Sequence, residues 1–173
     1  IDSTKVCVGD KVLITKYAAI EGTSILAKEL ENYLEDKMDK DKIIEAQNMG
    51  KLISVVKEGM ILGEIGVNYM HDITEGGILG AVWEGAIAVD KGIKIYQDLI
   101  PMKEVTKEIA SILDIDPYRL ISSGSMLVIA KEEKLSEIQR KLEEENIPVT
   151  VIGEVIDKGI YMEKKGAVKE IPA

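Results

Sequence analysis

The sequence predicts an α+β fold in which helices pack on a mixed, mostly antiparallel sheet. Strand-like and helix-like patterns alternate along the 173 residues, which is typical of one domain with interleaved elements. The last two strand patterns, Pro148–Ile156 and Ile160–Met162, flank the turn Asp157-Lys158-Gly159 and predict an antiparallel hairpin. Hydrophobic residues make up 46% of the chain and Phe is absent, so we expect a core of Ile, Leu, Val, Met and Ala.

The first half of the chain predicts one strand followed by three helical segments. Val12–Thr15 follows a glycine turn and predicts a short buried strand. After Gly22, apolar residues recur at helical spacing, and Thr23 or Ser24 would cap this helix. The apolar face of that helix comprises Ile25, Leu26, Leu30, Tyr33 and Leu34.

The charged stretch Glu35–Asp41 predicts a solvated helix end and loop. A second helical pattern begins near Asp41 and is interrupted at Gly50. A third amphipathic pattern runs from Ile53 toward Gly66.

The second half predicts further strands and helices in alternation. Each element is bounded by glycine, proline or small polar residues, which favour turns. In chain order we expect a strand at Val67–Met70, a helix at Ile78–Val89, a turn at Asp90–Gly92, a strand at Ile93–Tyr96, a helix after Pro101, a turn at Asp116-Pro117, a loop at Ser122–Ser125, a strand at Met126–Ala130 and a helix at Lys131–Glu145.

Composition excludes several classes of function. The net charge of −9 argues against nucleic acid or an anionic membrane surface as a partner. The single Cys7 excludes an intrachain disulfide and a cysteine-based zinc site. No apolar run approaches the roughly 20 residues of a membrane span, and no leader precedes Ile1, so we expect a cytoplasmic location.

The heptad His71–Gly77 is the most informative feature of the chain. It lies between an apolar strand pattern and a helical pattern, so it predicts a polar turn that opens a helix. Thr74 would cap the helix, and Gly76 and Gly77 would let an anion approach the backbone amides, where the helix dipole favours negative charge. The heptad is therefore a candidate phosphate site.

The same heptad carries three titratable side chains. Asp72 and Glu75 would hold a divalent cation that offsets phosphate charge, and His71 and Asp72 are the candidate catalytic residues. Two structural alternatives stay open: an acidic cap on an ordinary helix, and a hydrogen-bonded structural histidine. His71 is the only histidine, so a three-histidine metal site is impossible.

Two other loops can join this turn in space. Lys16–Thr23 links a strand to a helix and places Gly22 and Thr23 at the predicted helix start. Ser122–Ser125 contributes Ser123 and Gly124 beside a predicted strand. Small polar residues are also ordinary loop chemistry. Walker, dinucleotide-binding, zincin and nucleophile-elbow motifs are all missing.

The string from Met70 to Gly77 resembles the M-x-D-x-[ST]-x-G-G element of the aminoimidazole ribonucleotide (AIR) synthase superfamily, in its C-terminal domain. The likeness is closest to the AIR synthase-related (PurM/HypE-like) branch, and it continues in order through most of the chain. The further matching segments are Gly9–Thr15, Glu21–Ala27, Ile100–Met102, Leu113–Pro117, Ser123–Leu127 and Ile152–Val155.

The resemblance implies a three-layer α/β/α domain with ferredoxin-like features. It also implies ATP and Mg²⁺ as cofactors, with phosphoryl transfer to an amide or carbonyl oxygen of a small-molecule or protein-bound substrate. Residues 1–173 would form one domain, and both cofactors would require a partner, an N-terminal ATP-binding domain that also makes a homodimer. Asp72 and Glu75 would lie at the metal–phosphate side, Gly76 and Gly77 would give backbone approach, and Thr74 would cap the helix.

Two departures from the family pattern restrict what is carried over. Hydrogenase-maturation members end in a reactive cysteine, whereas this sequence ends Lys169–Ala173, so nitrile formation is not expected unless further chain follows. Glu75 stands where some relatives carry Arg or Asp, which leaves the substrate open. The alternative function is a non-catalytic binding or interaction domain that keeps the fold.

Overall fold

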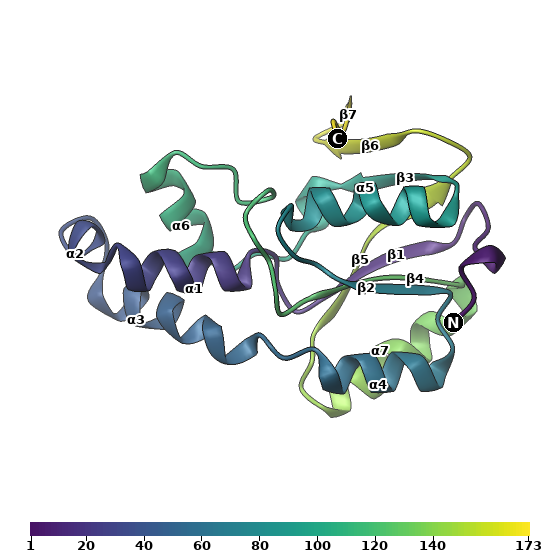
Figure 1. The fold of residues 1–173 in the computed structure, drawn as a ribbon, viewed down its shortest axis with the longest axis horizontal. Helices are drawn as coiled ribbons and strands as arrows, with labels where there is room; N and C mark the ends of the chain where they lie inside the picture. The colour runs from purple at the N-terminus through teal and green to yellow at the C-terminus, as the bar shows by residue number, and fades with distance from the viewer.

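The computed structural model describes residues 1–173, and its centre is a seven-stranded sheet (Figure 1). The strands are β1 (Lys11–Thr15), β2 (Tyr69–Asp72), β3 (Gly92–Tyr96), β4 (Met126–Ala130), β5 (Val149–Ile156), β6 (Ile160–Lys164) and β7 (Ala167–Glu170). Their order across the sheet is β2-β4-β1-β5-β3-β6-β7. Every neighbouring pair is antiparallel except β3 and β6, so the predicted mixed, mostly antiparallel sheet is confirmed.

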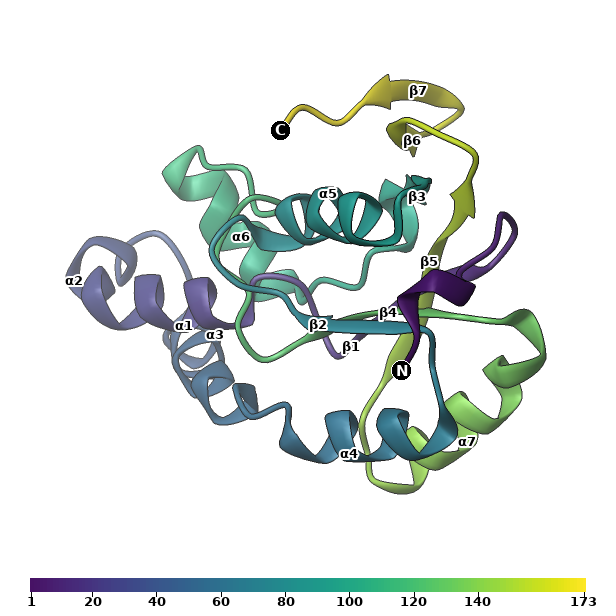
Figure 2. The same ribbon diagram turned by 45° about the vertical axis from the view of Figure 1, so that its right-hand side comes forward.

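Seven α-helices accompany the sheet, and Figures 1 and 2 show α5 over one face and α4 with α7 over the other. The helices are α1 (Ile20–Glu29), α2 (Glu31–Leu34), α3 (Lys40–Asn48), α4 (Val56–Ile65), α5 (Gly77–Val89), α6 (Glu104–Leu113) and α7 (Leu135–Glu144). Short 3₁₀ turns add η1 (Ser3–Lys5), η2 (Met49–Leu52), η3 (Gln97–Leu99) and η4 (Glu132–Lys134). The arrangement is three-layer α/β/α. None of the helices has the length and apolar character that crossing a bilayer requires.

The sheet is buried on both faces along its central strands. In β1, Val12 and Ile14 pack with α5, while Leu13 packs with α4 and α7. In β4, Leu127 and Val128 divide between the same two clusters. Successive side chains of a strand point to opposite faces, so a continuous apolar run supplies two cores at once.

A third cluster lies beside the sheet, where α1, α3 and α6 pack on one another (Figure 1). Ile20, Ile43 and Ile109 are buried in it. Ile25 and Tyr33, which the sequence predicts on an apolar face, are instead 39% and 50% exposed. The prediction holds for Leu26, Leu30 and Leu34, which lie in or against this cluster. It is wrong for Ile25, because α1 buries the face of Ile20, Thr23 and Ala27 instead, and for Tyr33, because a new helix begins at Glu31.

The predicted hairpin of the last two strand patterns is wrong. β5 and β6 both exist, but β3 lies between them, antiparallel to β5 and parallel to β6. The connection from β5 to β6 passes close to Gly92, at the start of β3. An added Cβ on Gly92 would lie 2.5 Å from the Gly159 carbonyl oxygen, so this close approach requires glycine. The true hairpin is β6–β7, whose second strand is wholly exposed and therefore gives no apolar pattern.

Candidate functional site

The motif begins in an edge strand. β2 pairs only with β4. It starts two residues later than predicted, at Tyr69, and ends two residues later, at Asp72, so His71 and Asp72 belong to the strand and not to the turn. Both side chains are exposed. His71 Nδ1 lies 2.7 Å from the carbonyl oxygen of Asp72. Burial raises the pKa of the nearby Tyr69 phenol, and the Glu84 carboxylate raises it further.

The turn after β2 is anchored by backbone hydrogen bonds. Ile73 is fully buried, and its N–H donates to the Ser125 carbonyl at 3.0 Å. The Thr74 carbonyl accepts from the N–H groups of Gly77 (3.1 Å) and Ser122 (3.2 Å). The predicted cap is wrong, because Gly76 is the N-cap of α5 and no side chain bonds there. The carbonyl of Thr74, rather than its hydroxyl, closes the turn.

The two glycines of the motif have different environments. Gly77 is buried at φ +66°, and an added Cβ would lie 2.6 Å from the Tyr118 carbonyl oxygen. The Leu79 N–H also donates to that oxygen, at 3.2 Å. Gly76 is exposed, with φ −76°. The start of α5 is therefore covered on the Gly77 side by the segment around Tyr118 and open on the Gly76 side.

The prediction that the two other loops join this turn is confirmed. Ser122 is fully buried between them: its Oγ accepts the Ala19 N–H at 2.7 Å, while its own N–H donates to Thr74. The Gly22 N–H donates to the Ile121 carbonyl at 2.9 Å. One short segment after Leu120 thus holds the start of α1 and the turn before α5.

Gly22 and Thr23 lie at the N-terminal end of α1, as its third and fourth residues, so neither residue precedes the helix as a cap. The N-cap is Ala19, at φ +60° and without a side-chain cap, so the prediction of Thr23 or Ser24 as cap is wrong. The Thr23 hydroxyl donates to the Ala19 carbonyl at 2.6 Å, and the Leu120 side chain lies against Gly22. Both residues are therefore buried in contacts within the protein.

Gly124 and Ser123 also differ in exposure. Gly124 is buried at φ +116°, and an added Cβ would lie 2.9 Å from the Leu52 carbonyl oxygen. This contact holds the loop against the connection between α3 and α4. Ser123 is half-buried, so it is the more accessible of the two.

A buried ion pair that the sequence did not predict lies near this junction. Lys16 Nζ lies 3.2 Å from Glu58 Oε2, and both side chains are more than 90% buried. The ammonium also donates to the carbonyls of Leu52 and Ser54, at 2.8 Å each, and the Thr15 hydroxyl donates to Glu58. A signal existed, since Glu58 lies four residues before the buried Leu62 and so shares its helix face.

A family model described as "AIR synthase related protein, C-terminal domain" matches residues 8–164. The chain belongs to this family. It is 29% identical over 126 residues to a protein of Methanocaldococcus jannaschii named for hydrogenase expression or formation, a match that covers 72% of this chain and 35% of that protein. It is 25% identical over 133 residues to carbamoyl dehydratase HypE of Bradyrhizobium diazoefficiens, covering 77% and 36%.

Solved structures support the fold of this AIR synthase-related domain. Escherichia coli HypE matches with a TM-score of 0.77 at 20% identity, over 99% of this chain and 52% of that one. HypE in complex with ATP gives 0.73 at 20%, covering 99% and 52%, and a HypE–HypF complex gives 0.73 at 22%, covering 98% and 54%. The chain thus spans about half of these structures and about a third of the curated relatives named above.

The two carboxylates of the motif in this AIR synthase-related domain are free of partners within the protein. Asp72 and Glu75 are exposed, and neither forms an ion pair or a side-chain hydrogen bond. No three His, Cys, Asp or Glu side chains gather as a metal site. Mg²⁺ takes six oxygens, so two carboxylates alone cannot fill its coordination sphere. The other ligands would come from phosphate, water or another domain.

Ser122→Ala tests the junction of this AIR synthase-related domain. The change leaves the buried Ala19 N–H without its acceptor, so we expect the free energy of unfolding to fall by about 1–3 kcal/mol. Urea denaturation measures this, and amide exchange at Ala19 should accelerate. Ser136→Ala, in the exposed part of α7, should change stability by no more than about 0.5 kcal/mol. Equal effects of the two variants would remove the bridging role.

Proposed function

We propose that this chain is the C-terminal domain of an ATP- and Mg²⁺-dependent enzyme that transfers a phosphoryl group to an amide or carbonyl oxygen. The observation that carries the proposal is the junction at Ser122, which holds an open, carboxylate-flanked helix start beside two other loops. The family match and the ATP complex of HypE support it.

In this proposal Asp72 and Glu75 hold Mg²⁺ together with phosphate oxygens, because both carboxylates are exposed and unpaired. The cation would neutralise charge that develops on the transferred group. Gly76 gives backbone approach at the open side of α5, where the helix dipole favours an anion. His71 is the adjacent candidate acid or base.

The proposed partner is an N-terminal ATP-binding domain, joined to this one or supplied separately. The chain spans about half of the solved HypE structures, which leaves room for such a domain. We propose further that the whole protein forms a homodimer and acts on a small-molecule or protein-bound amide. The HypE–HypF complex supports a protein partner.

The test is Mg²⁺-dependent ATP turnover by the assembly of both domains. Asp72→Asn, Glu75→Gln and Gly76→Val should each lower the rate at least about tenfold, because they remove metal ligands or block approach to the helix start. Asp157→Asn, at an exposed turn remote from the site, is the matched control and should not change it. Unchanged turnover in all three site variants would remove the site assignment.

The alternative is a binding or interaction domain without turnover. It is favoured by the coverage of α5 on the Gly77 side, where the Tyr118 carbonyl occupies the Leu79 amide. The turnover assay and calorimetry together separate the two functions. Phosphoryl transfer by the assembled domains excludes the alternative. Calorimetry that detects protein binding without any nucleotide binding supports it.

A further inference from the structure

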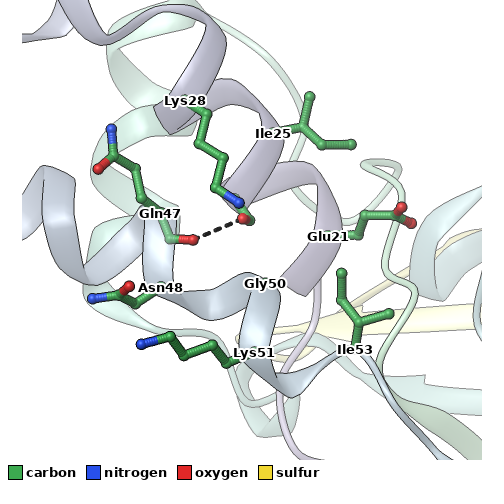
Figure 3. Close-up of a pocket in the computed structure, with 9 residues that line it drawn as sticks. Glu21, Ile25, Lys28, Gln47, Asn48, Gly50, Lys51 and Ile53 are labelled. Atoms are coloured by element: carbon green, nitrogen blue, oxygen red, sulfur yellow. Dashed lines mark hydrogen bonds between the residues drawn. The ribbon is translucent and has the colours of Figure 1, made fainter.

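A groove of about 500 Å³ lies between α1 and the junction of α3 with η2 (Figure 3). It includes no residue of the motif His71–Gly77. The Ser24 hydroxyl donates to the Gln47 carbonyl at 2.9 Å across its floor, so this carbonyl is not a free acceptor. Gly50 completes the floor, because an added Cβ there would lie 2.9 Å from Ser24 Oγ. The volume is in the range of small-molecule sites.

One end of the groove is cationic. In Figure 3, Lys28 extends from α1 above Gly50, and Asn48 and Lys51 lie to the left of and below Gly50. Neither lysine forms an ion pair, and Lys28 Nζ lies 3.5 Å from the position of an added Cβ on Gly50, so it reaches over the floor. The Asn48 side chain forms no hydrogen bond within the protein. Two ammonium groups and an amide are the donors that suit a phosphate dianion.

The opposite end is apolar with one carboxylate. Ile25 and Ile53 flank it, 39% and 38% exposed, and Glu21 lies beside them in Figure 3. Two facing aliphatic side chains bind a flat or aliphatic body, whereas the carboxylate repels an anion. The groove therefore orients a ligand, with the anion toward Lys28 and the organic body toward Ile25.

We propose that this groove binds a phosphate monoester of a small organic molecule. The phosphate lies between Lys28 and Lys51, and the organic body lies between the two isoleucines. The carboxylate of Glu21 accepts from a hydroxyl or amine of the ligand. Neither the motif residues nor the function proposed above enters this inference.

The probe is phenyl phosphate, added to the isotope-labelled chain and followed by amide NMR. We expect saturable shifts at Gly50 and Lys51, weaker binding of inorganic phosphate and benzoate, and none of phenol. Lys28→Ala/Lys51→Ala should weaken phenyl phosphate binding at least about tenfold, since both charges are lost. Lys40→Ala/Lys164→Ala removes the same charge from exposed sites outside the groove and should bind as the parent chain does.

Two results would overturn the proposal: shifts scattered outside the groove, or equal binding by the two double variants. Benzoate binding as tightly as phenyl phosphate would refute the phosphate assignment. Gly50→Ala gives a second test, because its methyl group would crowd Ser24 and Lys28 and should weaken binding. The exposed lysines are not expected to matter for folding, so loss of binding in the first double variant reports on the groove.

Discussion

Gly77→Ala is expected to lower the free energy of unfolding by about 2–4 kcal/mol. The backbone of Gly77 has φ +66°, which an Ala residue adopts only at a cost. Its new methyl group would also lie 2.6 Å from the Tyr118 carbonyl oxygen and 2.7 Å from that of Leu120. Since these contacts are to backbone, relief requires moving the segment that holds both loops at the site.

Gly80→Ala is the matched control, in the same helix and one turn later. No heavy atom lies within 4 Å of an added Cβ at Gly80, so we expect stability to rise by about 0.5–1 kcal/mol through helix propensity. Urea or thermal unfolding measures both variants. If Gly77→Ala were as stable as Gly80→Ala, the close approach of the Tyr118 segment to α5 would be wrong.

Lys16→Met and Glu58→Leu should each cost about 3–5 kcal/mol, because each leaves a buried charge without its partner. Lys16→Met also deprives the carbonyls of Leu52 and Ser54 of their donor. The double variant leaves no unpaired charge, so it should be destabilised by less than the sum of the single variants. A double-mutant cycle by urea denaturation gives the coupling.

Lys57→Ala supplies the control in the same helix. Its ion pair with Glu145 at 3.4 Å is solvent-exposed on both sides, so removal should change stability by less than about 1 kcal/mol. Additive effects of Lys16→Met and Glu58→Leu, or single losses as small as that of Lys57→Ala, would contradict the buried pair. The network ties β1 to the start of α4 and so fixes the connection that Gly124 contacts.

Local patterns determined most of the elements. The apolar run at Val12–Thr15 gives a strand because its side chains fill cores on both faces, and the pattern at Ile78–Val89 gives a helix with nearly the predicted bounds. The ordered motifs also identified the family that residues 8–164 match. The sequence predicts these elements because the spacing of apolar residues in a strand or a helix involves only residues that are close together in the chain.

Only the tertiary structure decided which segments lie together. A turn signal reports that the chain reverses, not that β3 lies between β5 and β6. Thr74 and Thr23 have the chemistry of caps, yet the carbonyl of Thr74 accepts the Gly77 N–H, and the start of α1 is held by the hydroxyl of Ser122, which lies far away in the sequence and accepts the Ala19 N–H. The Lys16–Glu58 pair joins residues 42 positions apart for the same reason. A buried donor or acceptor bonds to a group that lies near it in space. The periodicity of the sequence does not indicate which distant residues will lie near one another.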